Sequence, residues 1–370
     1  MKISKIFKLF AISVLSGSLI LTCGCGGSSD KTSADAGSSS DIASNTLSTD
    51  IDTSSKQTAS RLTEEQIALT RYLGNWSNKI SDIEKAQNGK FTFAIQTDTH
   101  FYDLTNENAA RNMASMSNFV KLEFIANLGD IVRGYSVQDV DSPENMRACM
   151  IDLVNRYTEN AKCPVFMTVG NHDTNIMWCQ KWADHTAQIT PQEQYEMIYS
   201  PLKAFNGDAM VTDDDGSYYY MDFPDDKVRI IMLNTANGEY DGTKYSNTFT
   251  ISDRQAEWFK NQALKTDFSV IVMSHVPMTA SFPDNGNGVH NSDKILAAVD
   301  SFVSGGGSFI AYMYGHTHAQ HVVVEEDTGR LHISFKDGGS YGEIVMIDLE
   351  NKTIETIGLG GVGDREFRYN

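Results

Sequence analysis

The stretch FTFAIQTDTH, residues 91–100, joins an apolar run to an acid and a histidine. Phe91–Gln96 has the length and apolar character of a strand that is buried on both faces. Asp98 and His100 follow it directly, and both carry side chains that bind metal ions. Four later runs have the same apolar character: Phe124–Leu128, Pro164–Val169, Val270–Met273 and Phe309–Tyr314. We therefore expect five buried strands.

Helical-looking segments lie before and between these five runs. One near 63–87 precedes the first run, and the others lie near 106–121, 143–159, 192–204, 252–265 and 291–303. Two further segments, Ser217–Phe223 and Lys227–Asn234, indicate a hairpin around Pro224-Asp225-Asp226. The last part of the chain suggests strands near 320–326, 330–335, 343–349 and 353–358. Alternating strands and helices flanked by hairpins predict an α/β sandwich with a mixed sheet, flanked by helices.

A residue of a metal-binding type follows every one of the five runs. The full set is Asp98, His100, Asp130, Asn171, His275, His316 and His318. In open α/β sheets, ligands bind beyond the carboxyl ends of the strands, so we expect these side chains to form one site. If 98–100 and 316–318 are extended, the outer side chains of each triplet point to the same side. Carboxylate, imidazole and amide ligands suit manganese, iron or zinc better than calcium or copper(I).

The ordered motifs resemble those of a known family. They are Asp98-Thr99-His100, Gly129-Asp130, Gly170-Asn171-His172-Asp173, His275 and Gly315-His316-Thr317-His318. Over about residues 91–320 this order is similar to the calcineurin-like metallophosphoesterases, whose pattern is DxH, GD, GNH(D/E), H and GHxH. The resemblance implies a metallophosphoesterase-type β-sandwich and two divalent metal ions. One ion would take Asp98, His100, Asp130 and His318, and the other Asp130, Asn171, His275 and His316.

The same resemblance implies a chemistry. The ions would lower the pKa of bound water, and the resulting hydroxide would attack phosphorus. His172 would contact the phosphate and protonate the leaving oxygen, and Asp173 would fix the tautomer of His172. The expected activity is hydrolysis of small phosphate mono- or diesters. Two alternatives are a nucleotide or sugar-nucleotide pyrophosphohydrolase and a non-catalytic metal-binding surface lipoprotein.

Several residues lie outside the pattern. The stretch Gly129-Asp130-Ile131-Val132-Arg133 has no tyrosine where purple acid phosphatases have one. Val169 precedes Gly170 where serine/threonine protein phosphatases have an arginine. We expect the following to be surface or loop residues: Asp103, Arg133, His185, His290, His321 and His332. The cluster of Trp178, Cys179, Trp182 and His185 either forms a wall of the substrate pocket or serves packing.

The N-terminus is expected to direct export. Leu9–Thr22 is an uncharged apolar run of about 14 residues, which suits a signal peptide better than a spanning helix of roughly 20. Cys23 and Cys25 resemble the lipobox cysteine of bacterial lipoproteins, with Cys25 preferred; the alternative is an ordinary secretory signal. We expect a signal peptide over 1–25, a Ser/Thr-rich tether over 26–60 and the folded domain over 61–370. The protein would then be an extracytoplasmic membrane lipoprotein, or secreted.

The net charge limits the classes of binding partner, and the cysteine content limits disulfide bonding. A formal net charge of −18 disfavours binding to nucleic acid or anionic lipid surfaces, so the membrane contact would be the lipid anchor. A small anionic substrate would need local positive charge, which the metal ions would supply. Cys149, Cys163 and Cys179 are too few to form a disulfide framework.

Overall fold

The computed structural model describes residues 73–102, 109–213, 216–236, 242, 249–279 and 288–370. All of these belong to one compact unit, Arg61–Asn370. The expected signal peptide and tether lie outside the described residues, as does the beginning of the helix predicted near 63–87. The described part of that helix consists of a 3₁₀ segment, Gly74–Lys79, and α2, Ile80–Ala86.

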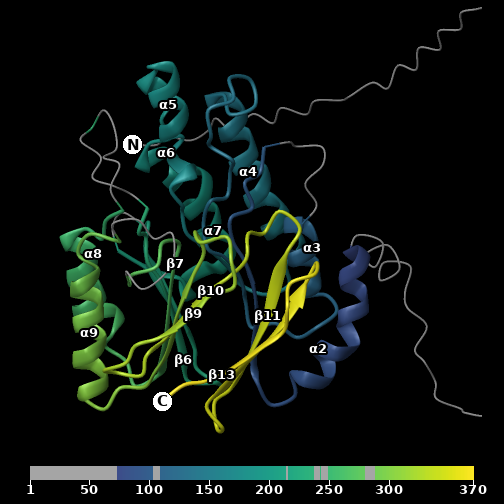
Figure 1. The fold of residues 1–370 in the computed structure, drawn as a ribbon, viewed down its shortest axis with the longest axis vertical. Helices are drawn as coiled ribbons and strands as arrows, with labels where there is room; N and C mark the ends of the chain where they lie inside the picture. The colour runs from purple at the N-terminus through teal and green to yellow at the C-terminus, as the bar shows by residue number, and fades with distance from the viewer. Residues whose placement is uncertain (1–72, 103–108, 214–215, 237–241, 243–248, 280–287) are drawn as a thin grey trace, which may run out of the picture. The chain divides into compact units, whose positions relative to one another are not determined.

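The strands form two mixed sheets (Figure 1). The six-stranded sheet has the order β13-β12-β11-β1-β2-β3. Its strands are β1 (Phe91–Gln96), β2 (Ile125–Asn127), β3 (Val165–Met167), β11 (Gly342–Asp348), β12 (Thr353–Leu359) and β13 (Arg365–Arg368). The seven-stranded sheet has the order β4-β5-β6-β7-β8-β10-β9. Its strands are β4 (Val211–Thr212), β5 (Tyr219–Phe223), β6 (Val228–Met232), β7 (Ser269–Ser274), β8 (Phe309–Tyr314), β9 (Val322–Val324) and β10 (Leu331–Ser334).

Each sheet contains a block of parallel strands, which reaches one edge of the six-stranded sheet and lies inside the seven-stranded one. In the first, β1 pairs with β2 and β2 with β3, both in parallel. In the second, β6, β7, β8 and β10 are successive parallel neighbours. The predicted hairpin is the antiparallel pair β5 and β6, with Phe223 opposite Val228. All five predicted buried strands are therefore confirmed, as is the α/β sandwich of mixed sheets.

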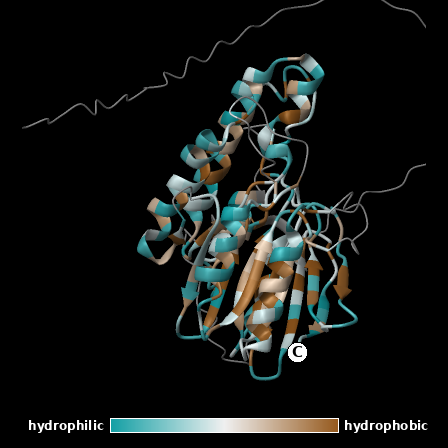
Figure 2. Ribbon diagram, turned by 90° about the vertical axis from the view of Figure 1, so that its left-hand side faces the viewer, coloured by the Kyte–Doolittle hydropathy of each residue, from teal (hydrophilic) through white to brown (hydrophobic). Residues whose placement is uncertain are grey.

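The two sheets pack on each other through an aromatic core. Phe93 and Phe124 stack with ring centroids 4.5 Å apart in the first sheet region. Phe223 of β5 lies 5.3 Å from Phe91 and 5.5 Å from Phe124, so the second sheet contributes to the same core. The strands carry mostly hydrophobic residues (Figure 2). Burial of this apolar surface is the main stabilising term of the fold.

Helices cover the outer faces of both sheets. In the seven-stranded sheet, Ile271 faces the inter-sheet core, whereas its neighbours Val270 and Val272 pack in a second cluster. That cluster includes residues of α8 (Asp253–Trp258) and α9 (Ser292–Ser304). The remaining helices are α3 (Ala109–Met116), α4 (Pro143–Asn160), α5 (Ile176–Trp182), α6 (Pro191–Gln194) and α7 (Ser200–Asn206). Figure 1 shows α8 and α9 on one side of the sheets and α2 and α3 on the other.

Local sequence explains where α4 and α6 begin. Ser142 caps α4 by accepting a hydrogen bond from the backbone N–H of Asn145, and Pro143 occupies the first turn, where no N–H donor is needed. Thr190 and Glu193 form a reciprocal capping box at α6. The helix predicted near 192–204 is divided, because a π-helical stretch, Tyr195–Tyr199, separates α6 from α7.

The sequence did not indicate every element. The short edge strands β4 and β13 and the helix α5 were not predicted. Residues of β13 alternate between half-buried and exposed. Both β4 and β13 are edge strands that pair with a neighbour on one side only, so neither shows a buried apolar run. Among the residues that the structure describes, no helix has both the length and the apolar character needed to cross a membrane.

Candidate metal centre

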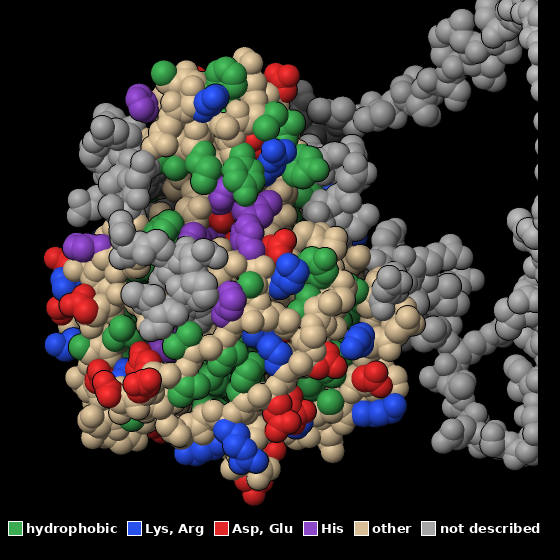
Figure 3. All heavy atoms as spheres, viewed as in Figure 1, with side chains coloured by type: hydrophobic (Ala, Val, Ile, Leu, Met, Phe, Trp, Pro, Cys, Tyr) green, Lys and Arg blue, Asp and Glu red, His purple; other side chains and the backbone are tan. Residues whose placement is uncertain are grey.

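The seven predicted metal-binding side chains come from two different sheets. Asp98 and His100 follow β1, Asp130 follows β2 and Asn171 follows β3, all in the six-stranded sheet. The others belong to the seven-stranded sheet: His275 follows β7, and His316 and His318 follow β8. The carboxyl ends of parallel strands thus meet where the two sheets adjoin. In the space-filling view, histidine side chains gather near the middle of one face of the molecule (Figure 3).

The backbone at these residues is not extended. Five of the seven have positive φ angles: Asp98 (50°), His100 (45°), Asp130 (49°), His316 (66°) and His318 (52°). The expectation that the two histidine triplets are extended is therefore wrong. Left-handed backbone is unfavourable for residues other than glycine, and it is kept only where the surroundings impose it. Here the backbone N–H groups of Asp98 and His100 donate to the carbonyl oxygens of Gly129 and Asp130, at 2.8 and 3.0 Å.

One group of four side chains surrounds Asp98. His318 Nε2 lies 3.1 Å from Asp98 Oδ1 and 3.1 Å from His100 Nε2. With Asp130, these residues bring one ligand atom each within 4.8 Å of one another. The other oxygen of Asp98, Oδ2, accepts hydrogen bonds from the N–H of His316 and the hydroxyl of Thr97. Oδ2 thus fixes the carboxylate to the scaffold, and Oδ1 faces the imidazoles.

A second group includes Asp130 again. His275 Nε2 lies 3.3 Å from Asp130 Oδ2, and Asn171 Oδ1 lies 3.1 Å from both His275 Nε2 and His316 Nδ1. Asp130 Oδ1 accepts from the N–H of His172 at 2.8 Å, so Oδ2 is the oxygen that faces the rings. His275 Nδ1 is held by the carbonyl oxygen of Leu128 at 2.8 Å. Such contacts orient ligands in metalloproteins.

The donor atoms fit a pair of metal ions. Two ligand atoms that each lie about 2.1 Å from one ion are roughly 3.0–3.4 Å apart, and the separations above are 3.1–3.3 Å. Asp98 Oδ1 and His100 Nδ1 are buried without an aligned hydrogen bond to any described group. Burying such polar atoms is costly, and a cation would satisfy Asp98 Oδ1 together with His318 Nε2, which lies 3.1 Å away.

Burial and mutual charge separate the proton affinities of these groups. Burial opposes ionisation of Asp98 and Asp130, but the neighbouring His275 lowers the pKa of both carboxyl groups below the ordinary value. Burial also works against a charged His275, yet Asp130 and Asp98 raise its pKa to about 9. The pKa of His316 falls to about 4, first through burial and then through His275. The two carboxylates therefore carry the charge that attracts cations.

His172 lies beside the second group, with its ring turned by a backbone contact. Its Nδ1 lies 2.7 Å from the carbonyl oxygen of Arg133, and its Nε2 lies 3.7 Å from Asp130 Oδ2. Because a carbonyl only accepts, Nδ1 is the donor of this bond and Nε2 faces the metal centre.

Asp173 does not perform the role predicted for it. Its Oδ1 accepts from the N–H of Val132 at 2.9 Å, and its Oδ2 accepts from the N–H of Gly170 at 2.7 Å. The prediction that Asp173 fixes the tautomer of His172 is therefore wrong. The Asp173 carboxylate instead joins the loops that follow β2 and β3, because two backbone donors lie closer to it than the imidazole does.

Arg133 and Tyr135 lie at the centre, although the sequence did not indicate them. Besides its carbonyl contact, Arg133 places its guanidinium 5.2 Å from the ring centroid of Tyr102 and 5.5 Å from that of Tyr135. The Tyr135 ring lies 4.4 Å from the ring of His172 and 5.8 Å from that of His100. Their position shortly after the Gly129-Asp130 motif could have indicated in the sequence that they lie near the metal centre.

The other residues outside the pattern have mixed outcomes. His185 and His290 are exposed and His321 is half-buried, all outside strands and α-helices, and Asp103 lies outside the described part of the chain. His332 was expected at the surface, which is wrong: it is buried in β10 and hydrogen-bonds to Glu325 and the Tyr314 hydroxyl. These two polar partners allow an imidazole to be buried there.

The aromatic cluster after the Gly-Asn-His-Asp motif supports a loop. Trp178 and Cys179 are buried in a small cluster, whereas Trp182 is 41% exposed. The indole N–H groups of Trp178 and Trp182 donate to the carbonyl oxygens of Gln138 and Ser136. Of the two interpretations left open by the sequence, the structure favours packing, because these bonds hold the segment that follows Tyr135.

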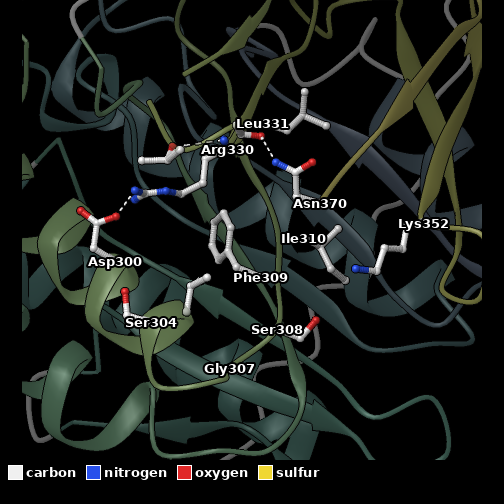
Figure 4. A pocket seen from close by; sticks show the side chains of 13 residues that line it. Asp300, Ser304, Gly307, Ser308, Phe309, Ile310, Arg330, Leu331, Lys352 and Asn370 are labelled. Atoms are coloured by element: carbon white, nitrogen blue, oxygen red, sulfur yellow. Dashed lines mark hydrogen bonds and ion pairs between the residues drawn. The ribbon is translucent and has the colours of Figure 1, made fainter. Parts of the chain in front are cut away.

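A cavity of about 410 Å³ lies away from the metal centre. Its lining includes Ser308 and Phe309 at the amino end of β8, together with Arg330, which pairs with Asp300 (Figure 4). The metal centre lies beyond the opposite, carboxyl end of the same strand, where His316 follows. This cavity is therefore separate from the candidate metal centre.

Comparisons with known proteins agree with this arrangement. The family model described as calcineurin-like phosphoesterase matches residues 91–320. A dimetal phosphatase from Danio rerio has a similar structure, with 15% identity and a TM-score of 0.56, over 76% of this chain and 99% of that one. A 5'-nucleotidase from Candida albicans also matches, with 15% identity and a TM-score of 0.42, over 70% of this chain and 47% of that one. At 15% identity, the likeness to the dimetal phosphatase concerns the fold alone.

No curated protein sequence is significantly similar to this chain. The family model covers more than half of the chain, and it spans all the motifs from Asp98 to His318. The strands that precede those motifs have the predicted positions, and their side chains converge at two adjoining sites. The chain therefore belongs to the calcineurin-like phosphoesterase family.

Proposed function

We propose that this protein hydrolyses small phosphate mono- or diesters with the aid of two divalent transition-metal ions. Membership of the family makes it a phosphoric ester hydrolase. The observation that carries the proposal is the pair of adjoining ligand groups that share Asp130. A shared carboxylate is typical of sites in which two ions act together on one phosphate.

Each ion has a proposed set of ligands. One set is Asp98, His100, Asp130 and His318, and the other is Asp130, Asn171, His275 and His316. Manganese, iron and zinc all accept such mixed oxygen and nitrogen donors. When bound, the ions supply Lewis-acid chemistry, since they withdraw charge from a phosphate and lower the pKa of water.

The two metal ions, once bound, would make this site suitable for an anion. Two carboxylates and two divalent ions leave a local surplus of about +2, although the whole chain has a net charge of −18. A phosphate ester would therefore be attracted to the centre and repelled elsewhere. This contrast favours small substrates over nucleic acids, whose extended backbone would meet the acidic surface.

His172 is the proposed proton donor to the leaving oxygen. The carbonyl oxygen of Arg133 accepts from Nδ1–H, so the doubly protonated ring would direct its Nε2 proton toward the centre. The side chain is only 7% exposed, so the ring lies within the site and not on the open surface. A non-catalytic metal-binding module would not need a histidine in this position. Its presence supports an enzyme over the surface-lipoprotein alternative.

We further propose that the enzyme acts outside the cytoplasm, held at a membrane by a lipid on Cys25 or Cys23. The support for this comes from the basic start, the short apolar run and the Ser/Thr-rich segment of the sequence. A tether of that composition would keep the domain away from the lipid surface.

Metal content and substrate range test the proposed function. Elemental analysis of the purified protein should find about two ions of manganese, iron or zinc per chain. Asp130→Asn should lower occupancy and turnover together, whereas Asp293→Asn, an exposed site on α9, should change neither. Monoesters, diesters and a nucleotide pyrophosphate should be compared at equal concentration. A protein that neither holds nor rebinds metal ions would refute the proposal, and exclusive cleavage of the pyrophosphate would favour the alternative.

A further inference from the structure

Two tyrosines and an arginine lie exposed beside the metal centre. Tyr102 is 49% exposed and Tyr135 is 37% exposed, although both are large and partly apolar. The Arg133 side chain between them is 28% exposed. Figure 3 shows hydrophobic and basic side chains next to the group of histidines on this face. Exposed aromatic rings around a polar centre are typical of ligand-binding surfaces.

Contacts with one another and with the neighbouring Asp141 and Trp182 hold these three residues in place. The guanidinium of Arg133 lies 5.2 and 5.5 Å from the centroids of the Tyr102 and Tyr135 rings, within the range of cation–π attraction. Arg133 Nε lies 3.6 Å from the buried carboxylate of Asp141. The carbonyl oxygen of Ser136, next to Tyr135, accepts a hydrogen bond from the Trp182 indole. The rings are thus positioned before any ligand arrives, which reduces the entropy lost on binding.

The position of His172 indicates which part of a substrate would meet these rings. The proposed proton donor must lie next to the leaving oxygen. The Tyr135 ring is 4.4 Å from the His172 ring, with the planes at 72°. The group attached to the leaving oxygen would therefore depart along the Tyr135 side of the centre.

We propose that Tyr102, Arg133 and Tyr135 form a subsite that binds an aromatic leaving group of the phosphate ester. The subsite deepens the proposed function and rests on it. An aryl or heteroaryl ring would pack against the free face or edge of Tyr135, and Arg133 would attract its π-electrons or a negative substituent. A saturated ring of the same size would gain the apolar contact but not these interactions.

A matched pair of substrates tests this preference. Benzyl phosphate and cyclohexylmethyl phosphate leave as primary alcohols of similar basicity, so they differ mainly in the aromatic ring. Each would be tested as a monoester and as its methyl diester. We expect the wild-type enzyme to favour the benzyl ester in kcat/KM. Tyr135→Ala and Tyr135→Leu should reduce that preference roughly 2–10-fold, mainly through KM.

Two controls separate the ring from the fold. Tyr135→Phe keeps the aromatic face and should keep the preference. Tyr195→Ala removes a tyrosine of similar exposure, 38%, on the stretch Tyr195–Tyr199, and should leave the preference unchanged. The subsite would be overturned if Tyr135→Leu lowered kcat/KM equally for the benzyl and the cyclohexylmethyl ester. An unchanged preference in Tyr135→Ala would overturn it too. Phenyl phosphate, whose leaving group needs a proton donor less than an alcohol does, gives a further check. If the Tyr135 variants lost turnover of both alkyl esters but kept that of phenyl phosphate, Tyr135 would only position His172, and the subsite would be overturned.

Binding without turnover distinguishes the subsite from the proposed function. Benzylphosphonate and cyclohexylmethylphosphonate are not hydrolysed, and calorimetry on the metal-loaded protein gives their Kd values directly. Tighter binding of the benzyl compound, lost in Tyr135→Ala, would support the subsite even if no ester were cleaved. Cleavage of esters with equal Kd values for the two phosphonates would leave the hydrolase intact and remove the subsite.

Discussion

The Nδ1 atom of His172 lies 2.7 Å from the backbone carbonyl oxygen of Arg133. The two residues follow different strands of the six-stranded sheet, so pairing of β2 with β3 sets this contact. A carbonyl partner fixes the ring orientation without adding a charge, unlike the carboxylate expected from the neighbouring Asp173. The Nε2 atom is thereby turned toward Asp130 and the metal centre.

This geometry predicts that His172→Ala keeps its metal ions and loses turnover. None of the proposed ligands is removed, so metal content should match the wild type. The rate should fall roughly 10²–10⁴-fold, as is usual when a positioned acid is lost. Nitrophenyl esters should lose less, because nitrophenol departs without needing a proton. Elemental analysis and turnover are measured together, with the exposed His185→Ala as control. Loss of metal from His172→Ala would make His172 a ligand instead.

Asp173→Asn should act on stability more than on proton transfer. The asparagine amide places an N–H₂ group toward either Val132 N–H or Gly170 N–H, so one of the two acceptors is lost. Leaving a buried donor unsatisfied costs about 1–3 kcal/mol. Thermal unfolding should show a lower Tm. The dependence of rate on the leaving group should stay as in the wild type, and a dependence like that of His172→Ala would restore the catalytic role first expected of Asp173.

Gly170→Ala should weaken metal binding. A Cβ atom built on Gly170 would collide with the Asp130 side chain and its backbone nitrogen, so the shared carboxylate would be displaced. Gly339→Ala is the matched control, because nothing lies within 4 Å of its Cβ position and its backbone is not left-handed. Metal titration should show lower affinity for Gly170→Ala alone. Equal affinities in both variants would mean that Asp130 does not need its present position.

Metal binding should release a proton from His275. Without an ion, Asp130 and Asp98 hold the pKa of His275 at about 9 against the effect of burial, so the ring is protonated at neutral pH. A ligand must be neutral, and affinity should therefore rise with pH until about 9. His316, whose pKa is about 4, is already neutral and should release none. Calorimetry in two buffers of different ionisation enthalpy counts the protons. No release at neutral pH, or affinity that is constant up to pH 9, would contradict this.

The lipid anchor gives a prediction about partitioning. Full-length protein expressed in a bacterial host should enter the detergent phase when its cysteine is acylated. Replacing both Cys23 and Cys25 by serine should release it to the aqueous phase. Cys163→Ser is a control, since this half-buried cysteine belongs to the folded domain. Detergent partitioning that survives in the double variant would indicate an uncleaved apolar helix.

The sequence alone predicted the five buried strands and the residues that gather at the candidate metal centre. Runs such as Phe91–Gln96 and Phe309–Tyr314 are apolar throughout, because strands in the middle of a covered sheet are buried on both faces. Residues with metal-binding side chains directly after those strands indicated one site. Both inferences depend on neighbours along the chain, which is why they needed no tertiary information.

Only the tertiary structure decided how these residues meet. Asp98 and His316 belong to different sheets, and the hydrogen bond from the N–H of His316 to Asp98 Oδ2 forms only when the sheets pack. Asp98 has a left-handed backbone, and its N–H donates to the carbonyl of Gly129, a partner outside its own segment. The burial of His332 and the position of Tyr135 over His172 depend on the same long-range packing. Contacts between residues far apart in sequence leave no local pattern, so the fold had to be seen before they could be assigned.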